Sequence, residues 1–226
     1  MKFKKLFYFK LLHLVIMDPL IKLLKEKPDA LKILCSAWNI LYIEGHGPDV
    51  GKRRENLLRM IFEKELGLKV DVSSSTERGW DISVTVGKEK RMYSVKTSEG
   101  LREVKVAWNG YPSIERAKEY KFTAPILYVI RDRSNNEISV FVFELEDIKK
   151  LREELGDNMW WIPKEGTNPR GFGLSKSAIE KLIDIAKNKD NYVSCTCQPV
   201  DLKKIAKDYW DGWYNLVKNL ALKHKQ

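Results

Sequence analysis

The stretch Trp80–Gly100, WDISVTVGKEKRMYSVKTSEG, decides the fold expected of this 226-residue chain. It predicts two short strands, Asp81–Val86 and Arg91–Thr97, joined by the polar loop Gly87–Lys90. Side chains alternate between the two faces of a strand. One face then carries Ile82, Val84, Val86, Tyr93 and Val95, and the other carries Asp81, Ser83, Thr85, Ser94 and Lys96. We expect the apolar face to pack into a core and the polar face to form a site.

The register of this hairpin brings an acid and a base together. A loop that pairs Val86 with Arg91 places Asp81 opposite Lys96, with roughly 4.5–5.5 Å between their Cβ atoms. An ordinary surface ion pair would contribute only ~0–1 kcal/mol, and this alternative needs no function. A carboxylate and an ammonium on a half-buried polar face are, however, what metal-assisted phosphodiester chemistry requires. We therefore treat Asp81 and Lys96 as a candidate catalytic pair.

The composition favours a polyanionic partner. Lys and Arg number 41 against 31 Asp and Glu, so the net charge is +10 and the pI is near 9.3. Such an excess attracts DNA or RNA, although a basic protein with no such role has the same composition. Three cysteines, Cys35, Cys195 and Cys197, form neither an even disulfide framework nor a four-ligand zinc pattern. They favour a reducing, cytoplasmic location.

The first 17 residues, MKFKKLFYFKLLHLVIM, resemble a secretory leader in their basic start and apolar run. Lys10 and His13 interrupt that run, and Asp18-Pro19 is typical of a helix start. We expect a structural segment here, and no stretch is apolar for long enough to span a membrane.

Periodicity and breaker residues predict the other elements. They are two helices meeting at Pro28, a helix from Gly51, a helix over 113–120, strands over 125–130 and 137–143, a helix over 144–155, a loop over 157–173, a helix opened by a capping box at Ser177, and a helix over 199–225. This order predicts a mixed α/β sheet flanked by helices in a single domain. Within 1–226 we distinguish an N-terminal helical part (1–44), a catalytic core (50–150), and a recognition loop with C-terminal helices (157–226).

Glu55 is a candidate partner for Asp81. Its neighbours at i+3 and i+7, Leu58 and Phe62, are apolar, so Glu55 lies on or beside the inward face of its helix. A favourable interaction with the helix dipole, ~0.3–1 kcal/mol, is one explanation. We favour an inward-pointing acid that, with Asp81, holds one or two hard cations such as Mg²⁺. The three histidines, His13, His46 and His224, are not placed for an alternative chemistry.

Three segments carry a resemblance to a known family: Gly51-Lys-Arg-Arg-Glu55, Gly79-Trp-Asp81-Ile and Tyr93-Ser-Val-Lys96-Thr. Together they resemble the PD-(D/E)xK nuclease superfamily, and the short basic chain is similar to its type II restriction endonucleases. The resemblance covers residues 51–97. It implies a restriction-endonuclease-like fold with a four-stranded mixed core sheet, Mg²⁺-dependent cleavage of double-stranded DNA leaving 5′-phosphates, and usually a homodimer.

One position departs from the family pattern. Ser94 stands where (D/E)xK places an acid, two residues before Lys96. We expect Glu55 to supply the missing carboxylate, with Glu99 and Glu103 as reserves. The resemblance thus implies catalytic residues Glu55, Asp81, Ser94 and Lys96, and a metal held by Asp81, Glu55 and the Val95 carbonyl.

Two segments of the sequence offer side chains that could contact DNA. The 157–173 loop offers base-reading and intercalating side chains, namely Asn158, Trp160, Trp161, Lys164, Asn168 and Arg170. Alternatively, its two tryptophans pack the last helices onto the sheet. Lys52, Arg53 and Arg54 suit phosphate anchoring or are a plain solvated charge run. A structure-specific junction or repair nuclease, and a binding module without catalysis, remain alternatives to a restriction enzyme.

Overall fold

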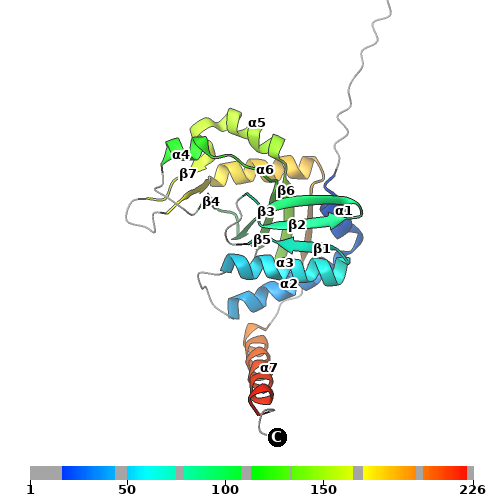
Figure 1. The fold of residues 1–226 in the computed structure, drawn as a ribbon. Helices are drawn as coiled ribbons and strands as arrows, with labels where there is room; N and C mark the ends of the chain where they lie inside the picture. The colour runs from blue at the N-terminus through cyan, green and yellow to red at the C-terminus, as the bar shows by residue number, and fades with distance from the viewer. Residues whose placement is uncertain are drawn as a thin grey trace, which may run out of the picture.

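A six-stranded mixed sheet lies between layers of helices (Figure 1). The computed structural model describes residues 17–43, 50–74, 79–107, 113–132, 134–164, 170–196 and 201–222. The strands are β1 (Lys69–Val72), β2 (Ile82–Val86), β3 (Glu89–Glu99), β4 (Val104–Ala107), β5 (Ile126–Asp132), β6 (Glu137–Phe143), β7 (Trp160–Trp161), β8 (Phe172–Leu174) and β9 (Tyr192–Thr196). The helices are α1 (Pro19–Glu26), α2 (Pro28–Ile43), α3 (Val50–Leu66), α4 (Ile114–Glu119), α5 (Leu145–Leu155), α6 (Lys176–Asn188) and α7 (Leu202–Leu222).

The main sheet has the order β1-β2-β3-β5-β6-β9. Strands β3 and β5 are parallel, and the other pairs are antiparallel. The predicted mixed α/β sheet flanked by helices is therefore confirmed. The sheet is wider than the four strands that the family resemblance implied, because β1 and β9, which the sequence analysis did not predict, form its edges.

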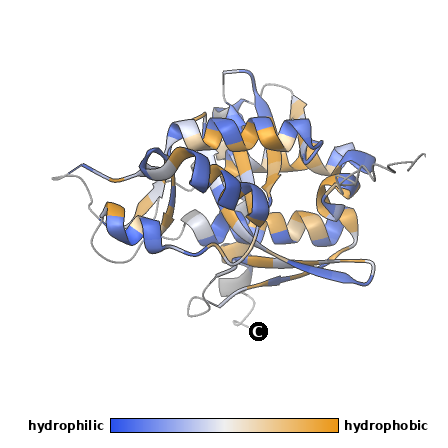
Figure 2. Cartoon of the chain, turned by 90° about the horizontal axis from the view of Figure 1, so that it is seen from above, coloured by the Kyte–Doolittle hydropathy of each residue, from blue (hydrophilic) through white to orange (hydrophobic). Residues whose placement is uncertain are grey.

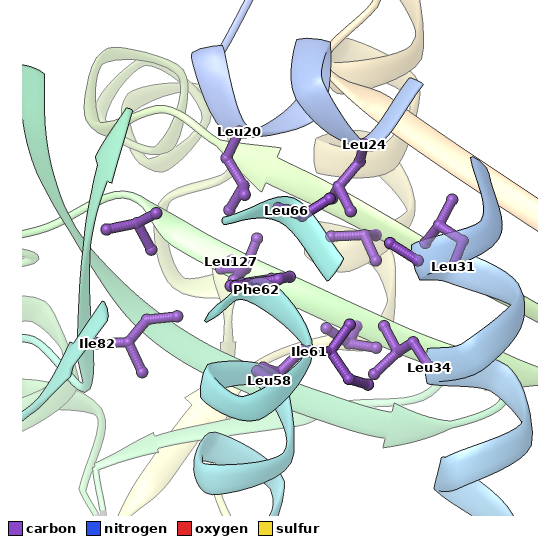
Figure 3. Close-up of a cluster of buried hydrophobic side chains, with 14 of the residues drawn as sticks. Leu20, Leu24, Leu31, Leu34, Leu58, Ile61, Phe62, Leu66, Ile82 and Leu127 are labelled. Carbon is purple, nitrogen blue, oxygen red and sulfur yellow. The ribbon is translucent and has the colours of Figure 1, made fainter. Parts of the chain in front are cut away.

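One face of the sheet packs against α1, α2 and α3. Leu20, Leu24, Leu31, Leu34, Leu58, Ile61, Phe62, Leu66, Ile82 and Leu127 converge in this core (Figure 3). The predicted apolar face of the hairpin lies here, since Ile82, Val84, Tyr93 and Val95 are all buried. Figure 2 shows the hydrophobic strands between the helical layers. The alternation read from the sequence therefore fixes which side of the hairpin faces this core.

The opposite face packs against α5, α6 and a small second sheet of order β4-β8-β7. Its core is rich in rings, including Tyr128, Phe141, Phe143, Trp160 and Phe172. The predicted loop over 157–173 is partly wrong, because β7 and β8 pair antiparallel within it. These strands are two and three residues long, too short for a periodic signal.

The hairpin register also differs from the prediction by two residues. Val86 pairs with Glu89, and Ile82 pairs with Tyr93, so Asp81 falls opposite Ser94 instead of Lys96. The turn is tighter than expected because Gly87 adopts a φ of +61°, which glycine allows at no steric cost. A shift of two residues keeps every side chain on its predicted face.

The cap of α6 is a second local correction. The Ser175 hydroxyl accepts a hydrogen bond from the Ala178 backbone N at 3.2 Å, so the helix begins at Lys176 and not at the capping box predicted from Ser177. The predicted start of α1 is confirmed, since the Asp18 carboxylate caps the Leu20 and Ile21 backbone amides.

Asp18 also closes a buried polar cluster. Its carboxylate lies 3.0 Å from an Arg91 guanidinium nitrogen and accepts the Tyr93 hydroxyl at 3.0 Å, and the same Arg91 binds Glu144. Asp18 and Tyr93 are both fully buried. Burial raises the pKa of Tyr93 far above its ordinary value, so its hydroxyl stays a donor. The cluster ties α1 to β3 and to the start of α5.

Removing this donor should destabilise the fold. We expect Tyr93→Phe to lower the free energy of unfolding by ~1–3 kcal/mol, because a buried carboxylate loses a hydrogen bond. Urea denaturation of the two proteins measures the difference. Tyr192→Phe makes the same chemical change at a half-buried ring on β9, outside this cluster, and should stay within about 0.5 kcal/mol of the parent. Equal stability of the Tyr93 variant would show that the cluster does not contribute to folding.

The cysteines depart from expectation at one position. Cys35 is disulfide-bonded, whereas Cys195 is a free thiol and Cys197 lies outside the described residues. A count of cysteines in a sequence does not show which of them tertiary packing brings within bonding distance.

Among the helices in the described ranges, none combines the length and apolar character needed to cross a membrane. The leader-like segment falls almost wholly in residues 1–16, outside the described part of the chain.

Candidate active site

Asp81 and Lys96 meet on the polar face of the hairpin. Lys96 Nζ lies 3.3 Å from Asp81 Oδ2, and the two side chains are 15% and 28% exposed. The same oxygen accepts hydrogen bonds from the Val95 backbone N at 2.6 Å and from the Ser94 hydroxyl at 3.1 Å. Three donors on one carboxylate oxygen fix the orientation of Asp81. The acid and base that the sequence analysis paired are therefore brought together.

Asp81 and Lys96 are in contact despite the two-residue difference in register, because the lysine side chain is long. The register places Asp81 opposite Ser94, and the Asp81 backbone N–H donates to the Tyr93 carbonyl at 2.8 Å. Lys96 is thus a diagonal neighbour of Asp81 on the same face, roughly 7–8 Å away at the backbone, and long side chains span this separation.

Gly79 sets the position of the Trp80-Asp81 segment. Its φ is +102°, and a Cβ at this position would lie 2.4 Å from Thr123 Oγ1. The Thr123 hydroxyl donates a hydrogen bond to the Gly79 carbonyl at 2.9 Å. Only glycine fits both the backbone conformation and the close approach. The Gly-Trp-Asp order in the sequence therefore has a structural reason.

Glu55 reaches the same region from α3. Its carboxylate is 15% exposed and lies 3.1 Å from Lys52 Nζ. Burial raises the pKa of Glu55, and the negative charge of Asp81 raises it further, while Lys52 and Lys96 act in the opposite direction. Lys52 also donates to the Ser73 carbonyl, and the Ser73 backbone N–H donates to the Asp81 carbonyl, so Glu55 lies near the Asp81 end of the pair. The structure thus groups two carboxylates with two lysines.

The reserve acids are placed differently. Glu99 Oε1 accepts a hydrogen bond from Trp38 Nε1 at 3.1 Å, on the side of the sheet that α2 covers. Glu99 follows Lys96 by three positions in the strand, so the two side chains point to opposite faces of β3. Glu103 is half-buried beyond the end of β3. The charge of Asp81 acts on Glu55, which favours Glu55 as the second acid.

A cavity of about 170 Å³ opens beside the pair. Asp81, Ser94 and Lys96 line one part of it, and the ring side chains of Trp80, Tyr120 and Phe122 line another. Burial raises the pKa of Tyr120, and the negative charge of Asp81 adds to this shift. Sequence patterns do not reveal Tyr120 and Phe122 as part of the site, because they follow Asp81 by about forty residues and lie in the connection between α4 and β5.

The basic run before Glu55 is less exposed than its composition suggests. Lys52 Nζ donates to the Ser73 carbonyl at 2.7 Å as well as pairing with Glu55. Arg54 donates to the Thr97 hydroxyl, and its guanidinium lies 5.4 Å from the centre of the Trp38 ring. Arg53 is exposed. The structure therefore turns Arg54 inward, which corrects its assignment to phosphate anchoring.

The proposed recognition loop divides into buried and exposed parts. Trp160 is 6% exposed, stacks on Phe122 with 6.2 Å between ring centres, and meets Phe172 edge to face. The predicted intercalating role of Trp160 is therefore wrong, because its ring is buried in the second core. The alternative, a packing role, holds for this tryptophan. Trp161 is half-buried, and Asn158, Lys164 and Arg170 are exposed. Asn168 lies outside the described residues, as do the three histidines.

The carboxylates of Asp81 and Glu55 determine which kind of metal ion could bind at this site. Within the described ranges, no three His, Cys, Asp or Glu side chains are grouped closely enough to hold a metal ion by themselves. Mg²⁺ needs no such cage, since proteins bind it through one or two carboxylates, with water and substrate phosphates completing its shell. Burial raises the pKa of Glu55, so a cation bound there would favour its ionised form. Asp81 and Glu55 therefore fit a hard divalent cation.

Comparisons with known proteins give one line of support. No family model matches this chain, and no curated protein matches it in sequence. Among solved structures, a restriction endonuclease in complex with substrate DNA is similar, with a TM-score of 0.64 and 20% sequence identity. The match covers 86% of this chain and all of that one. This chain therefore has the fold of a restriction endonuclease.

Proposed function

We propose that this protein is a divalent-metal-dependent endonuclease that cuts double-stranded DNA. The observation that carries the proposal is the contact of Asp81 with Lys96 beside Glu55, at the edge of a cavity in a restriction-endonuclease-like fold. Two carboxylates and a lysine are a donor set suited to phosphodiester hydrolysis. The net charge of +10 supports a polyanionic substrate.

Mg²⁺ is the cofactor that this donor set suits best. Asp81 and Glu55 would hold it, with the Val95 carbonyl as a further ligand. Bound there, the ion would polarise the phosphate and lower the pKa of a bound water. Each acid also pairs with a lysine, Glu55 with Lys52 and Asp81 with Lys96.

Each of the other side chains has a role that follows from its contacts. Lys96 places a positive charge next to Asp81, where it would stabilise negative charge developing on the phosphate. Ser94 and the Val95 amide hold Asp81 in one orientation. Ser94 is thus a positioning residue in this proposal, which explains how a neutral side chain can serve where related nucleases carry an acid.

DNA is proposed to bind across this edge of the molecule. Arg53 is an exposed base beside the site, and Asn158, Lys164 and Arg170 are exposed polar groups near β7 and β8. Phosphate contacts position a protein on DNA, whereas base contacts give specificity. We assign the first role to Lys52 and Arg53, and the second to the exposed residues of the 157–173 segment with Trp161.

The finer proposal is a type II restriction enzyme that acts as a homodimer in the cytoplasm, restricts foreign DNA and leaves 5′-phosphates. The motif spacing also loosely resembles the archaeal restriction enzyme ThaI, which cuts CGCG. DNA containing CGCG is therefore the first substrate to test.

Supercoiled plasmid carrying CGCG sites, incubated with the protein and Mg²⁺, tests the proposal. Discrete linear fragments that require Mg²⁺ are the expected result, and end sequencing would give the cut site and the 5′-phosphates. Cleavage confined to branched DNA would indicate a repair nuclease with the same site. A shift of DNA on a gel without any cleavage would reject the enzyme and leave a binding module.

Glu55→Gln should weaken the response to metal. Mg²⁺ binding to the folded protein raises its thermal stability by mass action, and the variant lacks one carboxylate ligand. We expect the parent to show a larger increase in melting temperature with Mg²⁺ than the variant, measured by differential scanning calorimetry. Glu63→Gln removes an exposed acid of the same helix and serves as the control. An unchanged response in the Glu55 variant would assign the second ligand to Glu103 or Glu99.

A further inference from the structure

The second half of α7 exposes an apolar surface that the rest of the described structure leaves uncovered. Figure 1 shows α7 running away from the body of the molecule. We call its exposed apolar side chains the α7 stripe: Trp210, Trp213, Tyr214, Leu216 and Val217, which are 48%, 52%, 61%, 59% and 41% exposed. Contiguous exposed apolar surface of this kind marks contact sites in soluble proteins.

The stripe continues a surface that is already used for packing. Helix α7 contacts α2, and in its first half Ile205 and Tyr209 are half-buried. Helical periodicity places Trp213 and Leu216 on the same side as these two residues. From Trp210 to Asn219 every residue is exposed. An isolated helix of this length is marginally stable in water, so the projecting half requires a partner surface.

Charge argues against DNA as that partner. Residues 210–219 contain one acid, Asp211, and one base, Lys218, and therefore carry no net charge, whereas the whole chain carries +10. A polyanion gains nothing from a neutral apolar stripe. When two copies of this neutral stripe pair, the two surfaces do not repel each other, and no unpaired charge is buried between them.

The area also suits a second copy. Three aromatic side chains that are about half exposed, together with Leu216 and Val217, offer roughly 400 Å² of apolar surface in each chain. Two such stripes bury about 800 Å², and their polar flanks bring the total to ~1,000 Å², the lower bound for a biological interface. Two-fold symmetry lets one surface serve both copies.

We propose that the α7 stripe binds the α7 stripe of a second copy of this chain, forming a two-fold helix pair that holds a homodimer. This deepens the proposed function and rests on it for its purpose, since a double-strand cut needs two active sites. The stripe itself is independent of Asp81 and Lys96.

Sedimentation of the full chain tests the proposal. The parent should sediment with twice the mass of 26.4 kDa. Leu216→Glu buries an unpaired charge in the pair and should weaken association by about a hundred-fold or more. Asn215→Glu adds the same charge on the polar side of α7 and should remain a dimer. Circular dichroism checks that both variants fold, which is expected because these residues project from the body.

The outcomes separate this inference from the proposed function. A parent that is monomeric at all soluble concentrations, or a Leu216→Glu variant that stays dimeric, overturns the α7 interface while DNA cleavage can still be observed. A monomeric parent that co-sediments with anionic lipid vesicles through the stripe assigns it to a membrane surface and also overturns the dimer. A dimer that Leu216→Glu dissociates supports the interface even if no DNA is cut.

Discussion

Asp81→Ala is expected to lower the rate of DNA cleavage by roughly a thousand-fold or more. The carboxylate is proposed to hold the metal, whose stabilisation of transition-state charge amounts to several kcal/mol, and each 1.4 kcal/mol or so corresponds to a factor of ten. Single-turnover cleavage of a plasmid or a short duplex with Mg²⁺ measures the rate. DNA binding should persist, because the exposed basic residues remain and binding would lose the repulsion between Asp81 and the phosphates.

The structure provides a matched control for this change. Asp71 also accepts a hydrogen bond from a serine, Ser83 at 3.2 Å, and from a lysine, Lys90 at 3.1 Å, on the same sheet. Its environment is more exposed, with 45% of its side chain accessible. Asp71→Ala should therefore cut DNA at the parental rate. If Asp81→Ala cuts as fast as Asp71→Ala, the proposed active site is wrong.

Lys96→Ala is expected to lower the cleavage rate by about a hundred- to a thousand-fold, the usual effect of removing one group that stabilises developing charge. Its ammonium is only 15% exposed, so its interaction with a phosphate is weakly screened. Lys90→Ala removes the matched lysine of the Asp71 pair and should leave the rate unchanged. If Lys96→Ala cuts DNA at the parental rate, the Asp81–Lys96 contact is a structural ion pair without a catalytic role.

The same variant should change the pH profile. Lys96 lowers the pKa of Glu55 by favouring its ionised form, so its removal should raise that pKa further above the ordinary value. Glu55 must be ionised to serve as a ligand. Residual activity of Lys96→Ala should therefore be lost at a higher pH than in the parent as the pH falls. If both proteins lose activity at the same pH as the pH falls, Lys96 does not influence the ionisation of Glu55.

Several parts of the fold were predictable because they follow from local patterns. The alternation in Trp80–Gly100 fixed the two faces of the hairpin, and the apolar runs of β5 and β6 fixed two interior strands. The stripe of Leu58, Ile61 and Phe62 predicted the buried side of α3. Even an error of two residues in register left Asp81 and Lys96 on one face, because the side-chain period of a strand is two.

Other features depended on contacts between segments far apart in the chain. The edge strands β1 and β9 are four and five residues long and half exposed, so they carry little hydrophobic signal. The sequence does not distinguish a surface position from a core position for Trp160. Its ring contacts with Phe122 and Phe172 in the folded chain place it in the core. The ring-lined part of the cavity likewise requires the α4–β5 connection to cross over Asp81.

Side-chain periodicity, which can be read along the chain, places an acid and a base on one face of one hairpin. The acid that joins them depends on packing between distant segments: α3 carries Glu55 toward the pair, while Glu99 points to the opposite face of β3 and binds Trp38. The physical reason is that periodicity is a property of neighbouring residues, whereas the meeting of a helix with a strand depends on how complete hydrophobic faces pack.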